Sequence, residues 1–122
     1  MKRKESTLAC MKHFLRTATY DTTFFELFLQ EVREFIARYG SVQFQLVSVT
    51  CIGYVDTSYH EYFSYTDFIE FIDEHVFNNN FDLYTNVTVR FYDYGCRYYY
   101  PLFSVYKEVH EKLYRRFQNA VL

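Results

Sequence analysis

The sequence predicts a single α+β domain, in which a small three- to four-stranded sheet, mixed or antiparallel, packs against about four helices. The spacing of the apolar residues indicates this class, because it changes from helical to alternating and back to helical along the chain. A chain of 122 residues, of which 50% are apolar, is long enough to form one core and too short to form two independent ones. We therefore expect residues 1–122 to form one domain.

Four segments carry apolar residues at helical spacing, and the first two lie in the N-terminal third. The first spans about 6–18. The second spans about 23–39, where Thr23 and Glu26 form a capping box and Gly40 stops the helix. These signals predict two consecutive helices before the first strand.

The other two helical segments lie in the second half of the chain. One is expected to begin near Ser64, whose side chain can cap the helix together with Asp67, and to end at the asparagine run 78–80. The last is expected over about 104–119 and should bury Val105 and Val109.

Directly after Gly40 the spacing of apolar residues changes to every second residue. Residues 42–52 alternate between apolar and polar, and the apolar parity shifts after Leu46, which favours a central strand covered on both faces. Residues 56–64 mix polar and aromatic side chains and suit either a loop or a short edge strand.

Two further runs, 87–92 and 96–100, predict a β-hairpin that turns at Tyr94 and Gly95 and ends at Pro101. With a two-residue turn, Arg90 would lie opposite Tyr99, and Tyr92 opposite Arg97.

Aromatic residues are unusually abundant, at 14 Phe and 14 Tyr, which is more aromatic surface than a core of this size encloses. We expect Phe to fill the core and part of the Tyr set to remain on the surface. Exposed Tyr is typical of contact surfaces, and it could also support a homodimer.

Cys10, Cys51 and Cys96 are widely spaced and form no metal-binding or redox pair. We expect buried thiols in a cytoplasmic protein, because the N-terminal residues lack the apolar run of a signal peptide and no stretch is long enough to span a membrane.

The sequence contains no recognisable catalytic, metal or nucleotide motif. His60 and His110 each precede a glutamate but lack the spacing of zinc ligands, and His110 is expected to face solvent. Only three glycines occur, and they form neither a phosphate-binding loop nor a nucleophile elbow. We therefore expect a protein without enzymatic activity, cofactor or metal.

The charges are segregated along the chain. From Tyr39 to Val89 there is no Lys or Arg, while seven carboxylates are present; we call this segment the acidic block. Within it, Asp67, Glu70 and Glu74 are spaced to share one helix face. Simple solvation explains such a face, and so does a basic partner. The predicted partner-binding residues are Glu61, Tyr62, Tyr65, Asp67, Glu70, Asp73 and Glu74.

A second hypothesis is binding of single-stranded nucleic acid through the hairpin and the basic last helix. Bases would stack on tyrosines and phosphates would meet arginines. The residues predicted for this role are Arg90, Tyr92, Arg97, Tyr99, Arg115 and Arg116. The net charge of −2 weighs against it.

The leading functional expectation is a small protein-binding module, an inhibitor or adaptor that docks on a basic partner protein. That partner could itself bind nucleic acid, because a row of carboxylates resembles a row of phosphates in charge. Inhibitors encoded by phages and mobile elements work through surfaces of this class.

Overall fold

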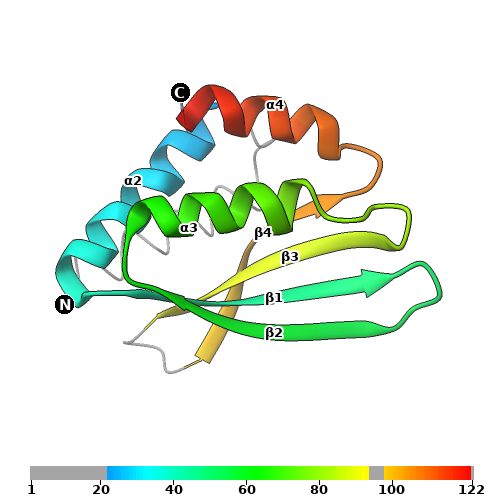
Figure 1. Ribbon diagram of the computed structural model, residues 1–122, viewed down its shortest axis with the longest axis horizontal. Helices are drawn as coiled ribbons and strands as arrows, with labels where there is room; N and C mark the ends of the chain where they lie inside the picture. The colour runs from blue at the N-terminus through cyan, green and yellow to red at the C-terminus, as the bar shows by residue number, and fades with distance from the viewer. Residues whose placement is uncertain (1–21, 94–97, 122) are drawn as a thin grey trace.

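The computed structural model describes residues 22–93 and 98–121 (Figure 1). The predicted helix at 6–18 and the predicted turn at Tyr94 and Gly95 lie outside these residues. The described elements are α2 (Thr22–Tyr39), β1 (Val42–Thr50), β2 (Val55–Tyr62), α3 (Tyr65–Phe71), η1 (Ile72–Phe77), β3 (Tyr84–Asp93), β4 (Tyr98–Tyr106) and α4 (His110–Val121).

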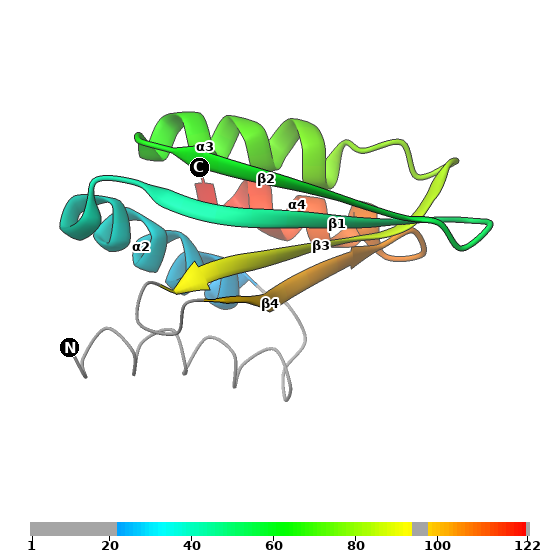
Figure 2. The same cartoon turned by 90° about the horizontal axis from the view of Figure 1, so that it is seen from below.

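The fold is α+β, as predicted. The strands form one four-stranded sheet in the order β2-β1-β3-β4, and each neighbouring pair is antiparallel. The central place expected for the strand after Gly40 is confirmed, and residues 55–62 form an edge strand rather than a loop. Within the described residues, α2, α4 and the continuous helix made by α3 and η1 cover one face of this sheet (Figures 1 and 2).

The core lies between these helices and the sheet and is built mainly from phenylalanine. Phe25 is fully buried and its ring lies 5.8 Å from the rings of Phe77, Phe103 and Phe117. Phe103 of β4 also meets Phe28 of α2 edge to face at 5.2 Å. Aromatic rings favour such edge-to-face contacts, so a single cluster joins α2, η1, β4 and α4.

The sheet is strongly curled. Tyr59 on edge strand β2 and Tyr99 on edge strand β4 have ring centroids 5.6 Å apart, although two strands separate them. Tyr59 and Tyr99 pair with the residues next to the buried Phe44 and Phe91, so both rings point away from the core. We call the face of the sheet that no described helix covers the outer face (Figure 2). Tyr92 of β3 joins these two tyrosines at 5.2 Å from Tyr99.

The expected end of the hairpin at Pro101 is wrong. Strand β4 continues to Tyr106, because Pro101 lies on an edge strand and beside a shift of register between Val89 and Arg90. Proline is tolerated at both kinds of position, since no regular ladder bond needs its missing N–H.

The last helix consequently begins at His110 rather than near residue 104. Val105 is fully buried, but in β4, and Val109 is 42% exposed in the turn before α4. Their spacing imitates a helix although they belong to a strand and a turn.

The predicted cross-strand pairs are also wrong. Arg90 lies opposite Pro101, and Tyr92 lies opposite Tyr99. The residues 94–97 separate the paired Asp93 and Tyr98, so the connection is longer than the two-residue turn that the prediction assumed.

Two further expectations about single residues are corrected. Cys51 is exposed in the turn after β1 rather than buried, because this turn projects from the sheet; Cys10 and Cys96 lie outside the described residues. His110 is half-buried rather than facing solvent, since its ring stacks on Phe81 at 4.5 Å and its Nδ1 lies 2.9 Å from the Lys107 carbonyl oxygen.

Replacing Phe25 by Ala should lower the free energy of unfolding by about 3 to 5 kcal/mol, because it leaves a cavity where four elements meet. Phe63 is 70% exposed, so Phe63→Ala removes the same atoms and should change stability by less than about 0.5 kcal/mol. Urea unfolding followed by circular dichroism measures both. Equal effects of the two variants would contradict the described core.

Candidate functional site

The helix formed by α3 and η1 begins at a side-chain cap. Ser64 has an extended backbone conformation and its Oγ accepts a hydrogen bond of 3.0 Å from the Asp67 N–H. The predicted capping role of Ser64 is thus confirmed. Phe68, Ile72 and Val76 are fully buried beneath the helix, so its opposite side faces solvent.

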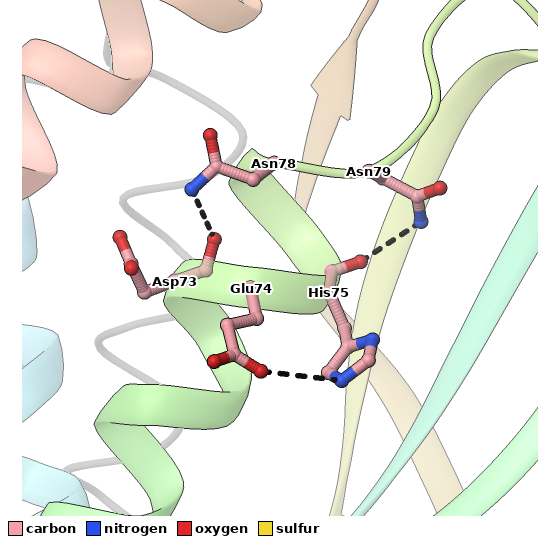
Figure 3. A network of polar contacts seen from close by, with 5 residues as sticks. All are labelled: Asp73, Glu74, His75, Asn78 and Asn79. Carbon is pink, nitrogen blue, oxygen red and sulfur yellow. Dashed lines mark hydrogen bonds and ion pairs between the residues drawn. The ribbon is translucent and has the colours of Figure 1, made fainter.

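The second half of this helix, η1, is a π-helix in which the Asn78 N–H donates to the Asp73 carbonyl five residues earlier, at 3.1 Å. Asparagine side chains satisfy the last carbonyls: Asn78 Nδ2 donates to the Asp73 oxygen and Asn79 Nδ2 to the His75 oxygen, both at 2.8 Å (Figure 3). The asparagine run therefore ends the helix as predicted. It does so by capping carbonyls that would otherwise lack partners.

A stack of rings joins this helix to β2. The Phe71 ring lies 4.4 Å from His60, 4.7 Å from His75 and 5.3 Å from Tyr62. His60 also stacks on Phe44 of β1 at 5.3 Å. The stack fixes the position of the helix over the edge of the sheet.

Beside this stack lies a surface hollow of about 170 Å³, which we call the acidic hollow. It is formed by β2 and by the exposed side of the helix, and no Lys or Arg is among its lining residues. They are Tyr62, Asp67, Glu70, Phe71, Glu74 and His75.

The acidic hollow is negatively charged, and its surroundings disfavour ionisation of the Tyr62 phenol. Burial raises the pKa of Tyr62 above its ordinary value, and the nearby carboxylates of Asp67 and Glu74 raise it further. The Tyr62 hydroxyl is protonated at neutral pH, as an ordinary phenol is, and can donate a hydrogen bond. The Glu74 carboxylate lies 3.8 Å from His75 Nε2 (Figure 3), an exposed contact that contributes little to stability.

Four of the seven predicted partner-binding residues meet at this hollow: Tyr62, Asp67, Glu70 and Glu74. Asp73 and Tyr65 do not line it. Tyr65 lies under the Arg33 guanidinium, at 4.3 Å from its ring, and belongs to a second cavity, which Glu70 also lines.

Glu61 faces away from the hollow, because neighbouring residues of a strand point to opposite faces. Its carboxylate accepts hydrogen bonds from Ser41 Oγ at 2.6 Å and Gln43 Nε2 at 3.2 Å. These bonds hold the pKa of Glu61 below its ordinary value. Glu61 is therefore already engaged within the chain.

Phe71 and His75 were not predicted as site residues. Their only sequence signal is the i, i+4 spacing that places them on one side of a helix. That signal is shared by many core positions, and the contact with His60 depends on the sheet.

The residues of the nucleic-acid hypothesis fall in two places. Arg90, Tyr92 and Tyr99 lie on the outer face, where Arg90 Nη2 donates to the Tyr99 carbonyl at 3.4 Å. Arg115 and Arg116 lie on α4, which covers the opposite face (Figure 1). Arg97 lies outside the described residues.

Other site chemistries find no support among residues 22–93 and 98–121. No three His, Cys, Asp or Glu side chains of this part converge closely enough to hold a metal ion. Nor does any of its helices combine the length and apolarity needed to cross a membrane.

Burial lowers the pKa of His60, and the charge of His75 lowers it further. Replacing His75 by Gln should therefore raise the pKa of His60 toward its ordinary value, which is measurable by NMR titration of the imidazole signals. His110→Gln is the control and should leave the His60 titration unchanged. An unchanged His60 pKa in His75→Gln would contradict the electrostatic influence of His75 on His60.

The lowered pKa also predicts how stability depends on pH. The unfolded chain binds a proton at His60 more readily than the folded chain, so the contribution of His60 to stability is fully present above about pH 6.5 and is lost as the pH drops toward the folded-state pKa. The unfolding free energy of His60→Gln should fall less steeply than that of the wild type over this interval. Parallel curves would contradict the assignment.

The sequence matches no family model, and no curated protein or solved structure is significantly similar to the chain. The functional proposal therefore rests on the geometry and charge of the site.

Proposed function

We propose that this chain is a non-enzymatic protein-binding module that docks its acidic hollow against a basic surface of a partner protein. The observation that carries the proposal is the convergence of Asp67, Glu70 and Glu74 around one hollow beside the Tyr62 phenol. Carboxylates supply charge complementarity, and the phenol supplies a donor and apolar area.

The repulsion among these three carboxylates favours a role in binding a basic partner. Like charges at i, i+3 and i+4 spacing destabilise a helix by a few tenths of a kcal/mol per pair, roughly. A basic partner would turn that repulsion into attraction at each carboxylate. Phe63, directly after β2, is 70% exposed and supplies an apolar contact at the start of the same segment.

The partner class that fits is a protein whose basic groove ordinarily holds phosphates. Three carboxylates along one helix face could replace a short run of phosphates electrostatically. An inhibitor or adaptor acting in this way needs no catalytic group, which suits a hollow lined by carboxylates and rings.

A second candidate is single-stranded nucleic acid on the outer face. Tyr92 and Tyr59 lie 5.2 and 5.6 Å from Tyr99, ring to ring, and Arg90 shares their face. Bases stack on such rings. Titration of labelled RNA and DNA at about 50 and 300 mM salt tests it, and tight, salt-steep binding would place this candidate first.

The proposed docking is tested with two triple variants of equal charge change. One replaces Asp67, Glu70 and Glu74 by Ala, and the control replaces the exposed Glu26, Glu34 and Glu108. The wild-type chain and both variants are each used as bait in an extract of the source organism. The captured basic protein is then purified and its affinity measured by calorimetry.

The hollow variant should bind the purified partner at least about tenfold more weakly, because charge pairs at an interface contribute a few kcal/mol. The control should bind within about threefold of the wild type, and wild-type binding should weaken as salt increases. Equal affinity of both variants, or binding insensitive to salt, would contradict the proposal.

A further inference from the structure

The two edges of the sheet differ in how they are protected. Edge strand β4 contains Pro101 and borders a register shift, and both features discourage pairing with another strand. Edge strand β2 pairs with β1 without a shift over eight residues and contains no Pro, Lys or Arg. Of the features that protect an edge, this strand has only the carboxylates of Asp56 and Glu61.

The outward-facing backbone groups of β2 follow from its pairing. Thr50 N–H donates to the Tyr54 carbonyl at 2.8 Å, and bonded and non-bonded pairs alternate in an antiparallel ladder. The N–H and C=O groups of Val55, Thr57, Tyr59 and Glu61 therefore point away from β1. No described strand lies beyond them.

The side chains around this edge are also accessible. Val55 is 61% exposed, Tyr59 64% and Phe63 70%. An edge of this length, partly apolar and with no strand beyond it among residues 22–93 and 98–121, is a template for another strand.

We propose that β2 pairs antiparallel with β2 of a second copy of this chain, around a two-fold axis at Tyr59, so that the two sheets become continuous. Tyr62 also lines the acidic hollow, so this pairing shares residues with the proposed docking, and the opposite salt dependences of the two distinguish them. The two-fold axis is perpendicular to the sheet, so the helices of both copies lie on the same face of the continuous sheet.

Cross-strand complementarity selects this register. With the axis at Tyr59, Thr57 lies opposite Glu61 of the second copy, and Asp56 opposite its Tyr62, so each carboxylate of β2 lies opposite a hydroxyl donor. Glu61 already accepts hydrogen bonds within its own chain, and a carboxylate has further lone pairs for an additional donor. Tyr59 lies opposite its own copy, which forms an aromatic pair.

The neighbouring registers are less favourable. Moving the axis to Ser58 places Glu61 opposite Val55. Placing it between Ser58 and Tyr59 sets Asp56 opposite Glu61, and like charges directly opposite each other destabilise a sheet. The latter register would also put the two sets of helices on opposite sides.

Electrostatics separates this pairing from docking on a basic protein. Both copies bring the acidic block to the interface, so their mutual repulsion opposes dimerisation and salt screens it. The dimer should therefore tighten as salt rises, whereas docking at the acidic hollow should weaken.

The first experiment is sedimentation of the full chain at about 50 and 500 mM salt, with Thr57→Pro and Thr57→Val. Thr57→Pro removes an N–H that faces away from β1, so it should preserve the fold. It should weaken the dimer at least about tenfold, because two ladder hydrogen bonds are lost. Thr57→Val keeps the N–H and should dimerise like the wild type. Circular dichroism confirms that each variant is folded.

The second experiment fixes the register. In a chain with Cys10, Cys51 and Cys96 replaced by Ser, Tyr59→Cys should form an intermolecular disulfide on mild oxidation, because Cα atoms of bonded pairs lie about 5.5 Å apart. Glu61→Cys is the control. Its two copies would lie about 14 Å apart, four residues along the ladder, and should not cross-link.

Two results would overturn the proposal. One is a monomer at a few hundred micromolar in both salt concentrations, which would leave the edge for a strand of a different protein. The other is a dimer that Thr57→Pro leaves intact and that Tyr59→Cys does not cross-link.

Discussion

The described structure depends on the contacts that the Phe103 ring makes with other aromatic rings. This ring projects from β4 into the helix-covered side of the sheet and meets Phe25 and Phe28 of α2 edge to face, while Phe77 of η1 stacks against it at 6.3 Å. One strand and two helices thus share a single aromatic cluster, to which Phe117 adds α4 through Phe25. Because this cluster holds η1 by its buried side, the carboxylates of the same helix are held on the solvent side. The acidic hollow is in this sense a consequence of the core.

Local signals predicted the elements that are determined locally. The cap at Ser64, the stop at Gly40 and the alternation after it are effects of neighbouring residues, and all three are confirmed. Pro101 and Val105 were interpreted wrongly because their environment is set by distant strands. A proline is acceptable in β4 because β4 is an edge and its ladder shifts register beside Pro101, and both are properties of the assembled sheet.

The candidate site shows the same division. Helical spacing was sufficient to bring Asp67, Glu70 and Glu74 together, but it could not separate Glu74, which lines the hollow, from Asp73, which does not. Nor could it show that Glu61 is held by Ser41, twenty residues away in sequence. His60 became a neighbour of Phe71 only when the helix packed on β2. The sequence also could not predict the outward edge of β2, because residues 56–64 show neither a clear strand nor a clear helix spacing of apolar residues.

The central claim is that the side of the molecule bearing the acidic hollow contacts a partner protein. Amide hydrogen exchange of the chain, free and bound to the purified partner, tests it most directly. The account predicts that new protection on binding concentrates between Tyr62 and Asn78. Protection confined to β3 and β4, with the segment from Tyr62 to Asn78 unchanged, would contradict it.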